Sequence, residues 1–572
     1  MFGHEESGRG RPRIAENRLF ALVSLAPLML LAACFIDTTP YTPLLPTPPT
    51  PRLRLPMNDA YVGSVHSGPL KPRFTWELPE EDPRGPLFEL EVSADPTFSA
   101  GTTAISTFKM SYQPPDDLEV SRVAPVGRRY FWRVRACVQR NCSDYSPTWW
   151  VNLGRSAKDL NGDGYADLAV GAPNTSTPRR PGRVYVFFGG PGSTLDAQPE
   201  NVLVGPSGVD DQFGASVTEG DFNGDGFADL VVGAPNVSRA YVYLGGDVAS
   251  LDETVDYELA PNIAGSRFGA SVALMGDING DGLSDLLVGM PSGANAPGDS
   301  FLYFGETQKS GLTPLVLHGA PGFGSQGSSA GDVNGDGLAD FAIGSSRDLN
   351  AIDPTSCEGA LYFGSTSATP YQNPSIEVMG KSSLTAPNPA CRLASRTAGD
   401  LNGDGLSETM FILGDLIPFA PTLSAMLLLR GEGTPQSFHF LDVSFSPPRD
   451  ERNAAAAGDA NGDGFGDLVA IRSDGIAVIM LGRAGDPNAI ASTGALTGQR
   501  VGDDFGSSLS AGDFNGDGFD DVVIGARTDN LAGSNAGRVY VYFGGAGETF
   551  DPTPDGVLAP ALSESLFGHS LP

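Results

Sequence analysis

The chain has 572 residues, of which 40% are hydrophobic and 9% aromatic, a composition typical of a globular protein and not of a disordered one. Its 74 glycines and 46 prolines favour an all-β protein with many tight turns over a helical enzyme. The formal net charge of −32 argues against nucleic acid or an anionic membrane surface as the main partner. The length predicts two or more folded units.

The first residues have the pattern of an export signal. Four arginines precede an apolar run over residues 19–31, and this run is too short to span a membrane. The Leu-Ala-Ala-Cys sequence that ends at Cys34 resembles the lipobox of bacterial lipoproteins. The resemblance implies a signal peptide over residues 1–34 and lipidation of Cys34. It also implies export to the bacterial cell envelope, as an outer-membrane or cell-surface protein attached to the membrane by lipid alone.

Two alternatives remain for this segment, namely cleavage without lipidation and a short buried helix, although Pro27 interrupts such a helix. The residues that follow, 35–52, are rich in proline and threonine. Proline-rich chain is extended and semi-rigid, so a spacer is predicted here that holds the folded part away from the bilayer.

Residues 53–153 contain short runs of alternating polar and apolar residues, which predict a β-sandwich. The run over residues 130–136, followed by Cys-Ser-Asp-Tyr-Ser at 142–146, resembles the final hairpin of fibronectin type III domains. Trp76 and Trp132 are expected in the core of this domain and not at a ligand site.

Four further cysteines form two possible disulfides, which are plausible in an exported protein. Cys137 with Cys142 would close a hairpin, and Cys357 with Cys391 would staple an insertion. Free buried thiols are the alternative. No Cys-x-x-Cys or Cys/His cluster suggests zinc.

The rest of the chain, residues 154–572, repeats one loop of the form Asp-x-Asn-Gly-Asp-Gly-x-x-Asp seven times, with one conservative change at its last position. Successive loops begin 54 to 68 residues apart, a period that indicates an array or a propeller. Apolar runs between the loops supply about four short strands for each repeat, which is one propeller blade. We therefore expect an all-β protein with a seven-bladed calcium-binding β-propeller preceded by a small β-sandwich. The loops begin at Asp159, Asp221, Asp277, Asp332, Asp400, Asp459 and Asp513.

Each loop offers the hard oxygen ligands that Ca²⁺ prefers. Side chains at positions 1, 3 and 5 point inward, position 7 offers a backbone carbonyl, and position 9 supplies a closing carboxylate. About seven Ca²⁺ ions are predicted. An EF-hand is excluded, because position 12 of the first two loops is a valine inside a strand, Val170 and Val232, and not a bidentate glutamate next to a helix. Mg²⁺ is less expected, because it prefers fewer protein ligands. The predicted metal ligands are Asp159, Asn161, Asp163, Tyr165 and Asp167; Asp221, Asn223, Asp225, Phe227 and Asp229; Asp277, Asn279, Asp281, Leu283 and Asp285; Asp332, Asn334, Asp336, Leu338 and Asp340; Asp400, Asn402, Asp404, Leu406 and Glu408; Asp459, Asn461, Asp463, Phe465 and Asp467; Asp513, Asn515, Asp517, Phe519 and Asp521.

The repeats resemble the FG-GAP repeats of integrin alpha subunits and of many bacterial secreted proteins. The resemblance rests on a Phe-Gly start, the calcium loop and a Val-Gly-Ala-Pro end. The fifth repeat departs from it, because Glu408 replaces the last aspartate, so weaker calcium binding is expected there, and the fifth and sixth blades are expected to be less regular. The first loop lacks a preceding Phe-Gly, whereas Phe567-Gly568 has no loop after it. We expect this last segment to complete the first blade; an interrupted eighth repeat is the alternative.

The functional prediction is an exported, lipid-anchored, calcium-stabilised surface protein that acts as a binding or adhesion module for a protein or glycan. The alternative is a structural envelope-scaffold lipoprotein without a dedicated ligand. No enzymatic activity is expected, since the sequence lacks a His-Glu-x-x-His motif and its Gly-x-Ser-x-Gly match at residues 327–331 directly precedes a loop. The Gly-Lys-Ser at 380–382 lacks the earlier glycine of a phosphate loop. The histidines are His4, His66, His318, His439 and His569.

Overall fold

The computed structural model shows an all-β protein, and the predicted fold class is confirmed at this level. Among the described residues the one helical element is a 3-10 turn, η1 (Pro235–Val237), and no helix there is long and apolar enough to cross a membrane. The structure describes residues 46–173, 180–192, 195, 197–208, 210–247, 251–261, 263, 265–291, 296–309, 311–346, 356–367, 371, 373–381, 391–415, 424–429, 438–445, 454–471, 475–484, 491–498, 503–547, 549–559 and 565–572.

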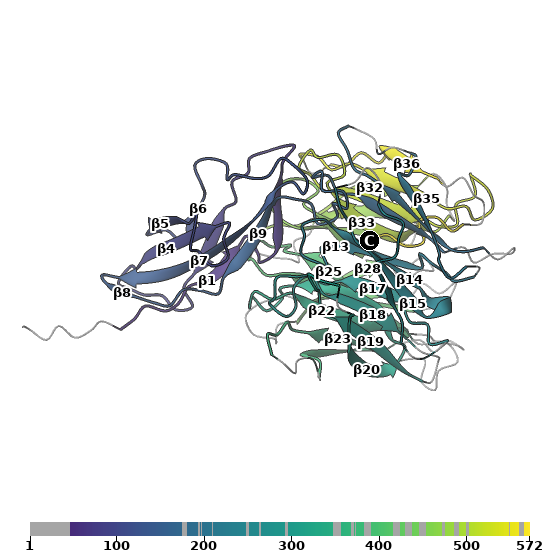
Figure 1. Cartoon of the computed structure of the whole chain (residues 1–572), viewed down its shortest axis with the longest axis horizontal. Helices are drawn as coiled ribbons and strands as arrows, with labels where there is room; N and C mark the ends of the chain where they lie inside the picture. Colours follow the sequence, from purple (N-terminus) through teal and green to yellow (C-terminus); the bar gives the residue numbers. More distant parts are fainter. Residues whose placement is uncertain are drawn as a thin grey trace, which may run out of the picture. The chain divides into compact units, whose positions relative to one another are not determined.

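Residues 52–154 form two sheets, called the sandwich below (Figure 1). One sheet has the order β1-β3-β6, and the other has the order β2-β9-β7-β4-β5, with β8 paired to β7. The strands are β1 (Arg52–Leu55), β2 (Ala60–Ser64), β3 (Phe74–Glu77), β4 (Leu87–Ser93), β5 (Thr103–Thr107), β6 (Ser111–Tyr112), β7 (Arg128–Val138), β8 (Asn141–Cys142) and β9 (Trp149–Gly154).

Alternation of buried and less buried side chains explains why these strands form two layers. In β7 every second residue from Tyr130 to Ala136 is buried, and Trp132 is completely enclosed. Its indole packs against Phe74 of the first sheet and Trp149 of the second. Trp76 is also buried, so both tryptophans lie in the core, as the sequence indicates.

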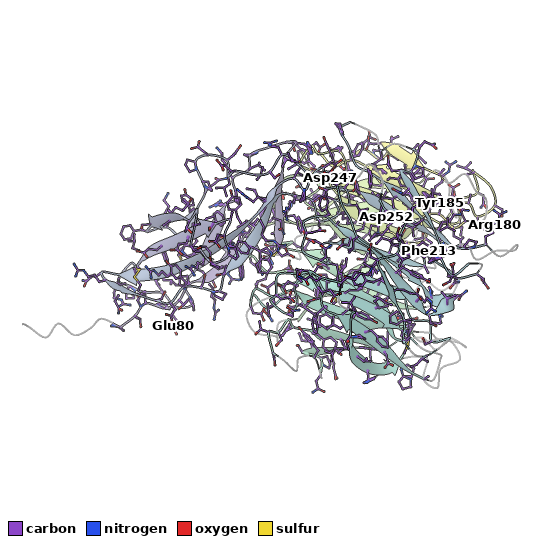
Figure 2. All side chains as sticks on the ribbon, in the orientation of Figure 1. Glu80, Arg180, Tyr185, Phe213, Asp247 and Asp252 are labelled. Carbon is purple, nitrogen blue, oxygen red and sulfur yellow. A yellow bond between two sulfur atoms is a disulfide. The ribbon has the colours of Figure 1, made fainter. Side chains whose placement is uncertain are left out.

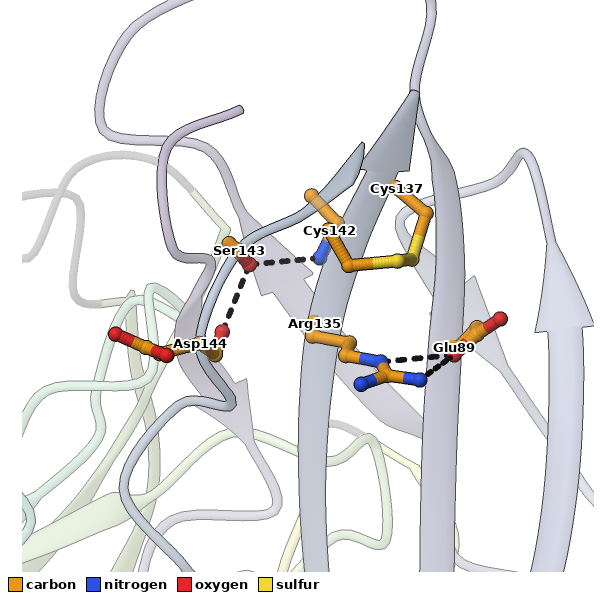
Figure 3. The surroundings of a disulfide bond; sticks show 7 residues. Glu89, Arg135, Cys137, Cys142, Ser143 and Asp144 are labelled. Atoms are coloured by element: carbon orange, nitrogen blue, oxygen red, sulfur yellow. Dashed lines mark hydrogen bonds and ion pairs between the residues drawn. A yellow bond between two sulfur atoms is a disulfide. The ribbon is translucent and has the colours of Figure 1, made fainter. Parts of the chain in front are cut away.

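A disulfide joins Cys137 and Cys142 across the β7–β8 hairpin (Figure 3). Beside it, Arg135 donates from Nε to Oε2 of Glu89 on the neighbouring strand β4, at 2.8 Å. The side chains of the second predicted pair, Cys357 and Cys391, lie outside the described residues, as does the predicted lipidation site Cys34.

Removal of the disulfide by Cys137→Ser with Cys142→Ser is expected to lower the free energy of unfolding of the sandwich by about 2 kcal/mol. The loss is modest because the cysteines are only five residues apart, and a short loop has little closure entropy to lose. Chemical denaturation followed by tryptophan fluorescence measures it. A midpoint that is unchanged under reducing conditions in the unmutated protein would contradict the expectation.

Within the described part of the chain, residues 168–558 form seven antiparallel sheets, each a meander of strands consecutive in sequence (Figure 1). The first has three strands and the other six have four each. The fifth and sixth sheets share this strand order, so the irregularity expected from their sequences does not extend to topology. The strands are β10 (Leu168–Ala172), β11 (Arg183–Phe187) and β12 (Asn201–Val204); β13 (Ser216–Gly220), β14 (Asp229–Ala234), β15 (Arg239–Tyr243) and β16 (Tyr257–Leu259); β17 (Ser271–Leu274), β18 (Leu286–Met290), β19 (Pro297–Tyr303) and β20 (Leu315–Pro321); β21 (Phe323–Gly331), β22 (Asp340–Ser345), β23 (Ser356–Tyr362) and β24 (Ile376–Lys381); β25 (Cys391–Gly399), β26 (Glu408–Asp415), β27 (Ser424–Leu429) and β28 (Phe438–Phe445); β29 (Ala454–Gly458), β30 (Asp467–Ile471), β31 (Ile476–Leu481) and β32 (Ala491–Thr497); β33 (Phe505–Gly512), β34 (Asp521–Ala526), β35 (Arg538–Tyr542) and β36 (Gly556–Leu558).

The second strand of each repeat is mainly apolar after the position-9 carboxylate, because both of its faces are covered. Every residue of β14 is buried, for example. Hydrophobic clusters lie between consecutive sheets all along the repeats, and one further cluster joins the seventh sheet to the first. In that cluster Leu168 and Tyr185 of the first sheet pack with Val523 and Val541 of the seventh. This cyclic order of cores is consistent with a β-propeller.

The segment Ser565–Pro572 fills the place of the missing fourth strand in the first sheet. Ser570 forms an antiparallel bridge with Gly171 of β10, and Gly171 N–H donates to the Ser570 carbonyl at 2.9 Å. The Phe567 ring is fully buried against Tyr185 and Phe187, with centroid distances of 5.2 and 6.2 Å; Figure 2 labels Tyr185. These contacts agree with the expectation that the last segment completes the first blade.

The first strands of the second to seventh sheets and the end of this segment line a common cavity of about 520 Å³. Lys158, Glu219, Arg396 and Asp520 are the charged side chains on its wall. Lys158 Nζ donates to Ser510 Oγ at 2.6 Å. All seven repeats therefore surround one space.

Candidate metal sites in the seven loops

Each predicted metal loop is wound around the carboxylate at its first position. In the first loop, Asp159 accepts backbone hydrogen bonds from Gly162 at 2.6 Å and from Gly164 at 2.7 Å. Gly164 has φ of +95°, a conformation that only glycine adopts without strain, which explains the residue type at position 6. The corresponding bond from position 6 to position 1 is present in all seven loops.

The carboxylate at position 9 is the most buried ligand and ties the loop to its sheet. Asp167 is completely enclosed, and its two oxygens accept from Leu160 N–H at 2.7 Å and from Gly189 N–H at 2.9 Å. Gly189 follows the strand β11, so the same side chain fixes both the loop and the end of a neighbouring strand. In the fifth loop Glu408 is equally buried and accepts from Leu401 N–H at 2.8 Å.

Burial makes these carboxylates unfavourable in their charged form. Desolvation raises the pKa of Asp285 to about 8 and that of Asp521 to about 9, and it raises the pKa of Asp167 well above its usual range. At position 1, desolvation first and the neighbouring Asp163 second raise the pKa of Asp159 to about 7. Each loop therefore gathers anionic groups whose ionised form needs a positive charge nearby.

The donor set fits Ca²⁺, because it combines carboxylate, amide and carbonyl oxygens and contains no sulfur or nitrogen ligand. In the structure these oxygens accept hydrogen bonds from the loop backbone, and no loop brings three acidic groups within 4.8 Å of one another. Among the described residues the one such cluster is Glu89 with Cys137 and Cys142, whose sulfurs are already bonded to each other. Calcium binding therefore stays a prediction that rests on donor chemistry and burial.

The fifth loop offers a specific test of this prediction. Asn402 Nδ2 donates to Oε1 of Glu408 at 2.8 Å, so the longer side chain reaches across toward position 3. We expect Glu408→Asp, which restores the residue found in the other loops, to raise the calcium affinity of this site by about tenfold, the free-energy equivalent of ~1.4 kcal/mol. Calorimetric titration of the apoprotein should then show one additional tight site. An unchanged titration curve would contradict the assignment.

The loops also form a closed cycle of contacts that the sequence did not predict. The N–H at position 8 of each loop donates to the carbonyl at position 1 of the preceding loop, and Ala166 of the first loop donates to Asp513 of the seventh at 2.9 Å. The glycine at position 4 faces the side chain at position 7 of the next loop; a Cβ on Gly162 would lie 2.3 Å from Phe227. In the same way, Gly516 of the seventh loop faces Tyr165 of the first.

A recurring bulky residue at position 7 is the signal that could have revealed this cycle. Sequence reasoning assigned that position only a carbonyl ligand. The structure gives its side chain a second role, because it occupies the space that the adjacent glycine leaves open. These side chains are Tyr165, Phe227, Leu283, Leu338, Leu406, Phe465 and Phe519.

The other motifs considered in the sequence do not form a recognisable site in the described residues. The Gly-x-Ser-x-Gly match lies inside strand β21 and not at a strand-to-helix turn. Val170 and Val232, at position 12 of the first two loops, lie in strands β10 and β14, where an EF-hand would have a helix.

Comparison with protein families identifies the repeats. The FG-GAP repeat matches residues 156–187 and 505–542, and the FG-GAP-like repeat matches residues 221–288 and 277–343. The chain contains FG-GAP repeats. They are homologous to integrin alpha subunits: integrin alpha-4 of Xenopus laevis is 32% identical over 235 residues, which is 35% of this chain and 22% of that protein.

A second group of relatives carries the name of an enzyme. Phosphatidylinositol-glycan-specific phospholipase D of Mus musculus is 26% identical over 441 residues, which is 70% of this chain and 46% of that protein. The Bos taurus protein of the same name is 37% identical over 154 residues, 24% of this chain and 18% of that protein. The chain thus spans less than half the length of the relatives it matches.

These relatives contradict the expectation that the chain has no enzymatic activity, because they carry the name of an enzyme. The expectation rested on the lack of a catalytic motif such as His-Glu-x-x-His in this sequence. An enzyme whose FG-GAP repeats lie apart from its reacting groups shows no such motif there, so the absence of one says nothing about the enzyme class.

Proposed function

We propose that the seven sheets are the blades of a closed propeller, stabilised by calcium, that presents a ligand-binding surface outside the cell. The observation that carries the proposal is the cycle of seven loops, in which the position-8 N–H of every loop bonds to the loop before it. The hydrophobic cluster between the seventh and first sheets supports closure independently. Homology with integrin alpha subunits supports a binding module.

In this proposal, the carboxylates and amide at positions 1, 3, 5 and 9 and the carbonyl at position 7 hold one ion in each loop. A bound divalent cation supplies the positive charge that the buried carboxylates need. The chain's own contribution is to keep those oxygens on one side of each loop through the hydrogen bonds from position 6 to position 1 and from position 2 to position 9. The sites are structural, and the partner binds elsewhere on the repeats.

The partner in this proposal is a protein or a glycan, and the protein acts in adhesion at the bacterial surface. Lipid attached at Cys34 tethers it, residues 35–52 act as the spacer, and the sandwich of fibronectin type III character separates the propeller from that spacer. These statements rest on the sequence patterns of the N-terminal residues and on the strands of the sandwich.

A second candidate function follows from the relatives named phosphatidylinositol-glycan-specific phospholipase D. The Mus musculus protein of this name matches 70% of this chain, compared with 35% for integrin alpha-4 of Xenopus laevis. The candidate activity is hydrolysis of a glycan-linked phosphatidylinositol. In this candidate function the repeats bind the molecule to which the glycan-linked phosphatidylinositol is attached.

The test is a binding experiment with the mature chain immobilised in 2 mM CaCl₂ or in chelator, exposed to a glycan array and to envelope proteins. Calcium-dependent retention of a defined glycan or protein supports the binding module. Retention of nothing in either condition overturns it and favours the scaffold alternative. In parallel, the purified chain is incubated with membranes that carry a glycan-phosphatidylinositol-anchored reporter, and release of the reporter supports the second candidate.

A further inference from the structure

The sandwich contacts the tips of the metal loops directly. His66 Nε2 lies 2.8 Å from the carbonyl oxygen of Asp163, and its ring stacks on Tyr165 with a centroid distance of 3.9 Å. Val126 N–H donates to the carbonyl of Gly162 at 3.0 Å. Two residues of the sandwich therefore make three contacts with the first loop, at Gly162, Asp163 and Tyr165.

The same face of other loops receives further contacts from the sandwich. Arg129 donates from Nη1 to the Gly282 carbonyl of the third loop at 2.9 Å, and Asn58 donates from Nδ2 to the Gly337 carbonyl of the fourth. Ser407 of the fifth loop donates to Sδ of Met57 at 3.7 Å. The carbonyls that accept these bonds belong to positions 4, 5 and 6. Position 5 is predicted to bind calcium through its side chain and position 7 through its carbonyl, so none of these accepting carbonyls is itself a predicted calcium ligand.

Packing at the glycines of position 6 confirms how close this approach is. A Cβ on Gly337 would lie 2.2 Å from Nε1 of Trp149, and one on Gly405 would lie 2.6 Å from the carbonyl oxygen of Arg54. The sixth loop differs, because a Cβ on Gly464 would meet nothing within 4 Å. Gly337 and Gly464 have nearly the same φ, +90° and +89°, so they differ in their surroundings and not in their backbone.

We infer that the loops have a second role as the docking surface of the sandwich, and that calcium in the loops holds the sandwich in place. The inference rests on the calcium part of the proposed function. The carbonyls that contact the sandwich, called the docking carbonyls below, belong to positions 4, 5 and 6. They are therefore within one residue of the ligand positions 3, 5 and 7 of the same loop. An ion that fixes those positions therefore also fixes the carbonyls, whereas mutual repulsion of the carboxylates displaces them when the ion is removed.

The coupling is reciprocal, as any linkage between two binding equilibria must be. Docking favours the ion-loaded conformation of the loops it touches, so loss of docking lowers their calcium affinity by the same factor. The docked sandwich also places Met57, Asn58 and Tyr61 on the wall of a cavity of about 280 Å³, together with Asp221 and Asp332 from the loops. Undocking removes these three residues from the wall of the cavity.

Hydrogen exchange of the full chain tests the calcium dependence, with the Val126 amide as reporter because its bond crosses from the sandwich to a loop. Chelation is expected to speed exchange at Val126 by at least tenfold, while amides in the β4–β7 ladder stay protected. Calorimetry on the same sample measures whether calcium binds. Binding with unchanged protection of Val126 overturns the inference and leaves the proposed function intact; no binding at all overturns both.

A matched pair of variants tests the contact itself. Gly337→Ala and Gly464→Ala introduce the same methyl group at the same loop position and the same φ, but only the first meets Trp149. In saturating calcium, Gly337→Ala is expected to speed exchange at Val126 by tenfold or more and Gly464→Ala by less than twofold. Equal effects of the two would overturn the inference.

His66→Ala serves as a second probe should Gly337→Ala fail to fold. His66 is exposed, so its truncation leaves the core of the sandwich intact. It removes the contacts with Asp163 and Tyr165. Faster exchange at Val126 in this variant supports docking through the loops, and exchange equal to that of the unmutated chain counts against it.

Discussion

Chelation of calcium is expected to lower the melting temperature of the full chain by roughly 10–20 °C. At a free ion concentration ten times the dissociation constant, each site adds about 1.4 kcal/mol, so seven sites together add about 10 kcal/mol. That sum is similar to the total stability of an ordinary domain. Scanning fluorimetry at one heating rate, with calcium and with chelator, measures the shift.

Three comparisons test whether the shift in melting temperature comes from calcium in the loops. Restoring calcium should recover the original melting temperature, and magnesium at the same concentration should recover much less, because the loops offer more oxygen ligands than magnesium ordinarily takes from a protein. Asp225→Asn, at an exposed position 5 in the second loop, should remove about one seventh of the shift. A melting temperature that is indifferent to chelator would refute calcium stabilisation.

Truncation of the buried ring of Phe567 to alanine is expected to destabilise the repeats by about 3–5 kcal/mol. The ring fills the space between the first and seventh sheets, where it touches Tyr185 and Phe187, and Phe567 N–H donates to the Ala536 carbonyl at 3.1 Å. Loss of the ring leaves a cavity and weakens the attachment of the segment that completes the first sheet. Denaturant unfolding measures the change.

Phe213→Ala is the matched control, because Phe213, labelled in Figure 2, is the corresponding Phe-Gly residue of an internal repeat. Phe213 and Phe567 are both completely buried. Phe213 packs against Tyr241 and Tyr243 of its own sheet. Equal losses in the two variants would mean that the closing segment is as firmly held as an internal strand. A loss at Phe213 without one at Phe567 would mean that the ring is not closed by this segment.

Much of the fold was accessible from the sequence because its signals are local and repeated. The glycines and aspartates of the loop have strict conformational roles, as the φ of Gly164 and the bonds to Asp159 show. The alternation in β7 follows from a sheet with one buried face. Completion of the first sheet by the last segment was suggested by a Phe-Gly sequence that had no loop after it, and the structure shows it in the bridge between Ser570 and Gly171.

The contacts between units were not accessible in this way, because they depend on how separate elements pack. Nothing in the sequence around His66 indicates that it stacks on Tyr165, which is about one hundred residues away. Position 7 was read for its carbonyl, and its side chain acquires a role only once two loops lie next to each other. The partner that we propose for the repeats cannot be identified from the sequence for the same reason, since its recognition depends on surface shape and not on a motif.

The cycle of seven loops has a kinetic consequence. A linear array of repeats frays from its terminal units, which have a neighbour on one side only. In this cycle every loop has two neighbours, because Ala166 bonds to Asp513 as Ala228 bonds to Asp159. Unfolding must therefore start by breaking an internal contact, which makes the unfolding rate slow and sets it by the weakest junction. Once that junction opens, the cycle of loops becomes a linear array with two ends, and the remaining repeats can then unfold from those ends.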